Sequence, residues 1–147
     1  MHNRQKPSEI INYGEMKRKI YASAQRALKV ALQNHGWLEA IAIEESIISD
    51  KIESYIARYF DIHKLCTLEG NIKHLKKYPV MTRELQELTR LLEAWKDERN
   101  YALHQLVKVE AGDNLSWEDR MARVESAAKD GFVLVGKVTS WARKIPK

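Results

Sequence analysis

The feature that most constrains the fold is the regular spacing of apolar residues within long segments of the chain. Between positions 82 and 109 they recur three and four residues apart, at Leu85, Leu88, Leu92, Trp95, Ala102 and Leu106. This spacing places their side chains on one face of an α-helix, which must be buried against other elements. The period predicts a long amphipathic helix that begins after Thr82 as its N-cap and continues to about Val109.

The same reasoning predicts the remaining helices. They are expected at Ser8–Asn34 (where Gly14 either interrupts the helix or marks its start), Trp37–Asp61, Leu68–Lys77 and from Trp117 onward, after a Ser116 cap with Asp119 at the capping-box position. The apolar stripe of the second helix is Ile41, Ile48, Ile52, Tyr55 and Tyr59. The stripe of the last helix is Trp117, Met121, Val124, Ala128, Phe132, Val135, Val138 and Ala142. Long amphipathic helices with short connections predict an all-α, antiparallel four- to five-helix bundle, formed as one domain over residues 1–147.

Composition agrees with a helical protein and narrows its class. The 147 residues include only 3 Pro and 6 Gly. No run of about 18 apolar residues is present, so we expect no membrane span, and the first residues lack the apolar core of a secretory signal. The single Cys66 excludes an internal disulfide and fits a cytoplasmic protein. The chain carries a net charge of +5, and its basic excess lies in residues 1–35, which could attract a polyanion or form a solvated face.

Two charged residues interrupt the apolar stripes. Arg99 continues the period of the segment 82–109, and Glu45 lies on the stripe of the second helix. An unpaired buried charge costs several kcal/mol, so such residues are paired or face a cleft. Three interpretations stay open: a structural ion pair, a face covered by a second subunit, or an active site in which Glu45 or Glu44 orients Arg99.

Arg99 also begins a short motif, Arg99-Asn100-Tyr101-Ala102-Leu103-His104. Histidine exchanges protons near neutral pH and can take one from a ribose 2′-hydroxyl or give one to a leaving 5′-oxygen. Arginine presents donors to phosphate oxygens as charge builds on them. Asn100 could hold the imidazole or the phosphate. On an ideal helix, however, the five-residue separation places Arg99 and His104 about 140° apart.

This motif resembles the hallmark of the HEPN superfamily, Arg-x4–6-His with a polar residue after the Arg. Those proteins are small helical bundles. The resemblance implies a metal-independent endoribonuclease that forms a 2′,3′-cyclic phosphate and needs no cofactor. Arg99, Asn100 and His104 would come from both subunits of a homodimer. It also implies toxin–antitoxin or phage-defence settings, with RNA as substrate and an antitoxin protein as a partner. Many bacterial toxin members have a tyrosine two positions after the His, where this chain has Leu106.

Other candidates are weaker. Lys73, Lys76 and Lys77 could contact a nucleic-acid backbone, although a solvated helix end is the safer interpretation. His63, Cys66 and His74 lack the spacing of a metal site, so we expect no metal. The alternative to an enzyme is a non-catalytic helical module that binds a protein or nucleic-acid partner.

Overall fold

The structure is a computed structural model that describes residues 3–77 and 82–144. It confirms the all-α prediction: five α-helices pack together, and the described residues contain no strand. The helices are α1 (Tyr13–Gln33), α2 (Trp37–Phe60), α3 (Leu68–Lys77), α4 (Arg83–Asn100) and α5 (Trp117–Lys144). A 3₁₀ turn, η1 (Pro7–Glu9), precedes α1, and a π-helical turn, η2 (Tyr101–Gln105), continues α4.

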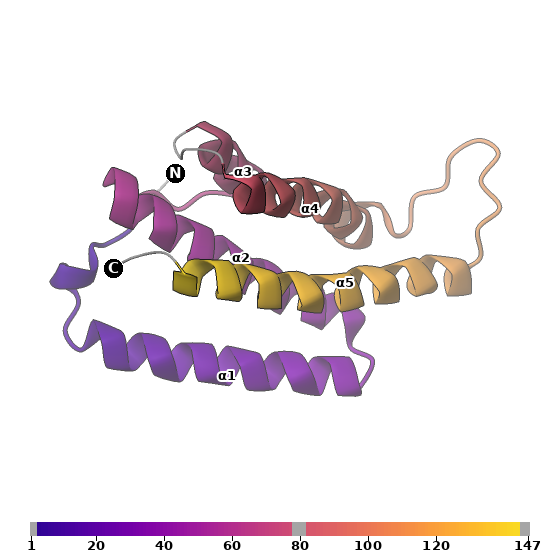
Figure 1. The fold of residues 1–147 in the computed structure, drawn as a ribbon. Coiled ribbons are helices and arrows are strands. Elements are labelled where there is room, and N and C mark those ends of the chain that lie inside the picture. Colours follow the sequence, from indigo (N-terminus) through magenta and orange to yellow (C-terminus); the bar gives the residue numbers. More distant parts are fainter. Residues whose placement is uncertain (1–2, 78–81, 145–147) are drawn as a thin grey trace.

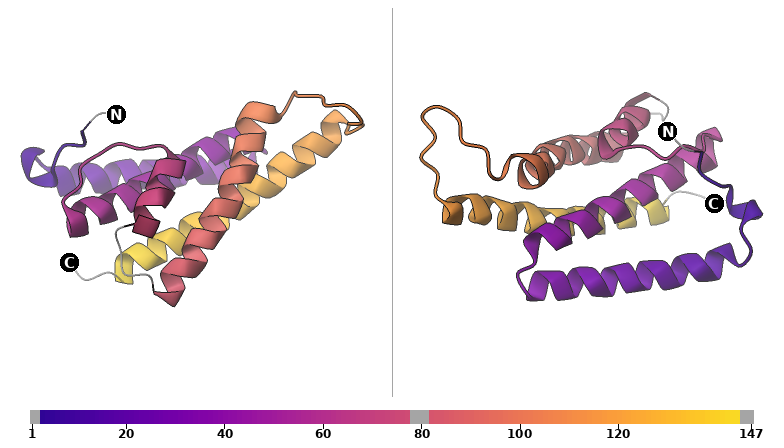
Figure 2. Two further views of the ribbon diagram at one scale, coloured as in Figure 1. Left: turned by 90° about the horizontal axis from the view of Figure 1, so that it is seen from above. Right: turned by 180° about the vertical axis from the view of Figure 1, so that it is seen from behind.

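The four long helices run in alternating directions (Figure 1). Helix α2 lies at the centre and packs against α1, α3 and α5, while α4 packs against α3 and α5. Figure 2 shows α4 crossing α5 and the segment after η2 looping back to the start of α5. No helix among the described residues is long and apolar enough to cross a membrane.

The helix ends show which local signals were decisive. The Thr82 hydroxyl accepts a hydrogen bond from the Leu85 amide at 3.2 Å, as its predicted N-cap role requires. Ser116 and Asp119 form the predicted reciprocal box, with two hydrogen bonds of 3.0 Å. Of the two starts left open for the first helix, Ser8 is wrong, and Gly14 lies next to the observed start. Asn12 has a left-handed backbone with φ of 56°, so the α-helix begins only at Tyr13.

The core contains most, but not all, of the predicted stripes. In α4 every stripe residue through Ala102 is buried, including Arg99. Tyr59, Trp117 and Phe132 are instead exposed. The buried face of α5 runs one position aside, through Arg120, Val124, Ala127, Ala128, Gly131, Leu134, Val135, Val138 and Trp141. The predicted face of α5 was therefore correct for Val124, Ala128, Val135 and Val138 and wrong for Trp117 and Phe132.

Candidate functional site

The Arg-x4-His motif lies where α4 changes from α-helical to π-helical geometry. Arg99 and Asn100 are the last residues of α4, and His104 lies in η2. The single α-helix predicted to continue to Val109 thus ends nine residues earlier, at Asn100. A π turn closes hydrogen bonds to the fifth residue rather than the fourth and so holds one extra residue. This widening turns His104 back towards the direction of Arg99 and reduces the angle expected for an ideal α-helix.

Arg99 is buried and ion-paired. Its residue is only 9% exposed, and its Nη2 lies 3.0 Å from Oε1 of Glu45 on α2. Arg99 and Glu45, the two charged residues that interrupt the predicted stripes, therefore form an ion pair. The Nε–H of Arg99 is buried and has no acceptor among the described residues.

His104 has the opposite environment. It is exposed, as are its neighbours Leu103 and Gln105, whereas Asn100 is partly buried. Among the described residues, no hydrogen bond or ion pair joins Arg99, Asn100 and His104 within one chain. The motif thus combines an accessible imidazole with an anchored, mostly covered guanidinium.

Glu44 does not orient Arg99. Its side chain is fully buried, and neither carboxyl oxygen has a hydrogen-bond partner among the described residues. Burial raises the pKa of Glu44 to about 9, because the charged form loses its hydration. The carboxyl fits against Gly131 of α5, where a Cβ atom would overlap it. Glu44 is thus a core residue that is neutral near pH 7.

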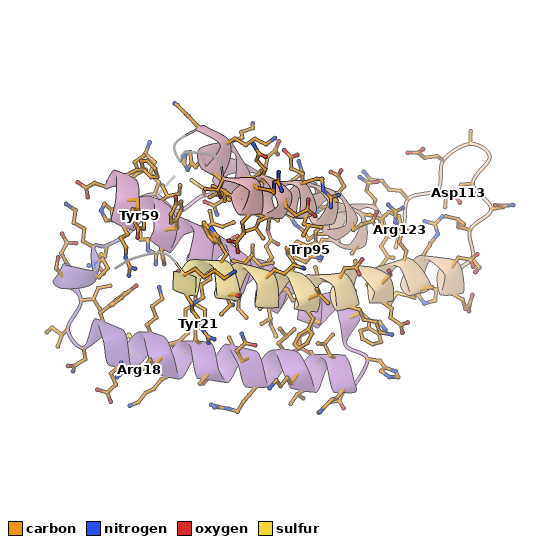
Figure 3. All side chains as sticks on the ribbon, in the orientation of Figure 1. Arg18, Tyr21, Tyr59, Trp95, Asp113 and Arg123 are labelled. Atoms are coloured by element: carbon orange, nitrogen blue, oxygen red, sulfur yellow. The ribbon has the colours of Figure 1, made fainter. Side chains whose placement is uncertain are left out.

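Two arginines of α5, which the sequence did not single out, hold the motif in place. The Arg123 guanidinium lies 3.7 Å from the centroid of the Tyr101 ring and forms two hydrogen bonds of 2.8 and 3.1 Å to Glu98 (Figure 3). Arg120 is buried and donates to the carbonyls of Leu106 at 3.0 Å and Lys108 at 2.6 Å. Arg120 therefore donates to carbonyls just after η2, where no further helical turn supplies N–H donors to them.

Arg120 gives the same signal as Arg99, a charge within an apolar period. It lies four residues before Val124, on the face that is buried. The signal was missed because the predicted stripe was aligned on Trp117, which is 54% exposed. Counting back from Val124 by four residues, instead of by three to Met121, reaches Arg120.

An apolar surface borders the motif. Large apolar side chains on η2 and in the segment leading to α5 are 40% to 80% exposed: Leu103, Val107, Val109, Leu115 and Trp117. Single exposed apolar residues are normal on protein surfaces, but several along one segment indicate a contact surface. The exposed His104 belongs to this stretch of chain.

Two of the three lysines predicted to contact nucleic acid have acidic neighbours in the structure. Lys73 lies 3.9 Å from Glu69, and Lys76 pairs with Glu93 of α4. Acidic neighbours thus offset two of the charges proposed for nucleic-acid binding. In the described residues, no group of three or more His, Cys, Asp or Glu side chains could hold a metal ion.

Comparisons with protein-family models, curated proteins and solved structures gave no match for this chain. The class that the fold defines is an all-helical protein of five α-helices.

Proposed function

We propose that this chain is a metal-independent endoribonuclease of HEPN type that acts as a homodimer. The observation that carries the proposal is the π-helical turn, which holds an exposed His104 five residues after the ion-paired Arg99. Single π turns in helices are uncommon and frequently occur at functional sites. The π turn begins just after Arg99 and contains His104, so it changes the angle between these two residues, which are five positions apart.

The chemistry assigns each residue a role. His104 removes the proton of a ribose 2′-hydroxyl, whose oxygen attacks the adjacent phosphorus and displaces the 5′-oxygen. His104 of the second subunit protonates that leaving oxygen, so the products are a 2′,3′-cyclic phosphate and a 5′-hydroxyl. Arg99 stabilises the phosphate oxygens as negative charge builds, and Asn100 positions the phosphate or the imidazole.

We propose a dimer because one chain has only one of the two proton-transfer groups that the reaction uses. One subunit offers a single exposed imidazole, whereas the reaction uses a base and an acid. The apolar residues that border the motif provide a surface that a two-fold axis would pair with itself. Exchange of the Glu45 carboxylate for a phosphate oxygen would keep the Arg99 charge compensated, and its unused Nε would gain an acceptor.

Cleavage of a fluorescent RNA by the full chain in EDTA tests this proposal. We expect cyclic-phosphate products, and a loss of about 100-fold or more in His104→Ala, as for other general acid–base groups. The matched control is Gln105→Ala, an equally exposed neighbour on the same turn that should retain activity. Intact RNA with the wild-type chain, or undiminished cleavage by His104→Ala, would refute the enzyme.

The Arg99–Glu45 ion pair supports one alternative, a non-catalytic helical module in which this pair only ties α4 to α2. Under this alternative Arg99→Leu keeps the fold and can even stabilise it, as replacement of some buried ion pairs does. It also predicts partner binding that is unchanged in His104→Ala. Adjacent genes encoding an antitoxin would favour the nuclease and place it among toxins.

A further inference from the structure

A cavity lies at the other end of the bundle, between α1, the end of α2 and the end of α5, with Tyr59 among its lining residues (labelled in Figure 3). Its volume is about 550 Å³, which is within the range of small-molecule sites. Along α5, Arg143 at this cavity lies roughly 30 Å from Arg123 at the Arg-x4-His motif, at about 1.5 Å per residue. The cavity is thus separate from the proposed catalytic surface.

The cavity lining is strongly cationic. Arg4, Lys17, Lys51, Arg58 and Arg143 line it, and no carboxylate does. Residues far apart in the sequence supply these charges, so the fold assembles the cavity.

Two of the cations form a fixed framework. Arg4 and Lys17 bind the Asp50 carboxylate at 3.0 and 3.2 Å, and they donate to the Ser54 hydroxyl at 2.8 and 2.9 Å. Burial disfavours the charged form of Asp50, but the hydrogen bond from Tyr21 and the charges of Lys17 and Arg4 outweigh it, and the pKa of Asp50 is lowered. Asp50 therefore stays ionised and holds the framework in place.

The other three cations are not held in ion pairs. Lys51, Arg58 and Arg143 make no ion pair with any described residue, although Lys51 lies 4.3 Å from the centroid of the Tyr21 ring. Burial, and then the charge of Lys17, lower the pKa of Lys51; the charge of Asp50 partly offsets them, and the charge of Arg143 lowers the pKa further. Like charges gathered without an anion repel one another, and a bound anion would relieve that repulsion.

One wall of the cavity is aromatic. Tyr13, Tyr55 and Tyr59 line it. The Tyr55 ring is held against Trp141 with centroids 4.8 Å apart, and Tyr59 lies 5.1 Å from Tyr55. Tyrosine rings beside cations suit a ligand that has both a flat ring and a phosphate, because bases stack on aromatic side chains.

We propose that this cavity binds a nucleoside phosphate, with the phosphate on Lys51, Arg58 and Arg143 and the base against Tyr55 and Tyr59. The ligand is either a free nucleotide or the phosphorylated end of an RNA strand, which share this chemistry. The site does not depend on the proposed RNA cleavage.

Calorimetric titration of the full chain at low ionic strength tests the site. The probes are ADP, inorganic pyrophosphate and a 5′-phosphorylated 2′-O-methyl RNA tetramer, which lacks the nucleophile and so cannot be cleaved. We expect ADP or the tetramer to bind, and pyrophosphate to bind at least about tenfold more weakly because it has no base to stack. Tighter binding of ADP identifies a free nucleotide as the ligand, and tighter binding of the tetramer identifies a strand end.

Substitutions locate the binding. Arg58→Gln and Arg143→Gln together should weaken binding by about tenfold or more, because two charge-assisted contacts are lost. Both arginines are exposed, and circular dichroism verifies that the variant folds. Arg18→Gln is the control: Arg18 is an exposed arginine next to Lys17 that does not line the cavity, and its loss should change affinity less than about twofold.

Three results would overturn the proposal. The first is no binding of ADP or the tetramer. The second is equal affinity in the double variant, which would place the ligand elsewhere. The third is pyrophosphate, or an acidic hexapeptide of aspartates, binding as tightly as ADP, which would remove the role of the base.

Discussion

Replacement of the buried Glu44 by glutamine should make the protein more stable, and by an amount that grows with pH. Glu44 has no exposed surface and no hydrogen-bond partner for either carboxyl oxygen in the described residues. Burial raises its pKa from 4.5 to about 9. In the unfolded chain the same side chain regains its ordinary pKa, so folding takes up a proton at neutral pH.

The sign and size follow from linkage. Between the two pKa values the folded protein holds a proton that the unfolded chain has released, so the free energy of unfolding falls as pH rises. The slope is about 1.4 kcal/mol per pH unit. At about pH 7.5, three units above the ordinary pKa, the loss is about 4 kcal/mol. A domain of this kind has only about 5 to 15 kcal/mol of stability, so the effect is large.

Glu44→Gln keeps the size of the side chain and stays neutral at every pH. Its amide leaves buried groups unpaired, as the protonated carboxyl also does, so the two should be similar near pH 4.5 to within about 1 kcal/mol. The variant should then be more stable than wild type by about 4 kcal/mol near pH 7.5. Urea unfolding followed by circular dichroism at several pH values between about 5 and 8.5 measures this difference.

The control is Glu118→Gln, an exposed glutamate at the start of α5. Its substitution should change the free energy of unfolding by less than about 0.5 kcal/mol at any of these pH values. If the stabilities of wild type and Glu44→Gln decline in parallel across this range, Glu44 is not protonated in the fold. The reasoning from burial would then be refuted.

Three further substitutions test the packing described above. Gly131→Ala, which on an exposed helix would stabilise by about 1 kcal/mol, should lower the melting temperature because its Cβ overlaps the Glu44 carboxyl. Arg120→Ala removes the donor to two partly buried carbonyls and the ion pair with Asp113, so it should cost about 2 to 4 kcal/mol and speed proteolysis within residues 106–116. Asp50→Asn should destabilise by about 1 to 3 kcal/mol near pH 7. The pKa of Asp50 is lowered in the fold, so the destabilisation should disappear only well below pH 3.8, where wild-type Asp50 is protonated as well. Urea unfolding of wild type and Asp50→Asn at acid and at neutral pH measures the difference.

Apolar period and cap chemistry were sufficient to predict the helices. Trp37, Leu68 and Lys77 were predicted as helix ends and are observed as such. These signals are local: a cap or a helix-breaking residue acts within one turn, so neighbours in sequence determine it. The early end of the α-helix at Asn100 was not predictable in this way, because a π turn has no distinctive residue preference and depends on packing against α5.

The exact burial of charged residues was also beyond the sequence. Glu44 and Glu45 are adjacent, and the period favoured Glu45 as the buried one. Helix α2 packs against three other helices, so its buried face is too wide for a one-residue stripe to locate. The cavity beyond Arg58 could not be foreseen either, since it joins residues from α1, α2 and α5 that no sequence spacing relates.

The Arg99–Glu45 pair is the point on which the interpretation of the motif depends. A structural pair and a catalytic arginine predict the same distance of 3.0 Å in a chain without substrate. The two interpretations differ in the effect of a bound anion. For a catalytic Arg99, a phosphate would replace the Glu45 carboxylate at equal charge and also accept a hydrogen bond from Nε. For a purely structural pair, no phosphate would bind there. Because Arg99 is mostly covered whereas His104 is exposed, a catalytic role for Arg99 would require substrate to draw the guanidinium out of its pair. Loss of Glu45 should therefore weaken the fold in both cases, but only a catalytic Arg99 would make RNA compete with Glu45 for the same donor.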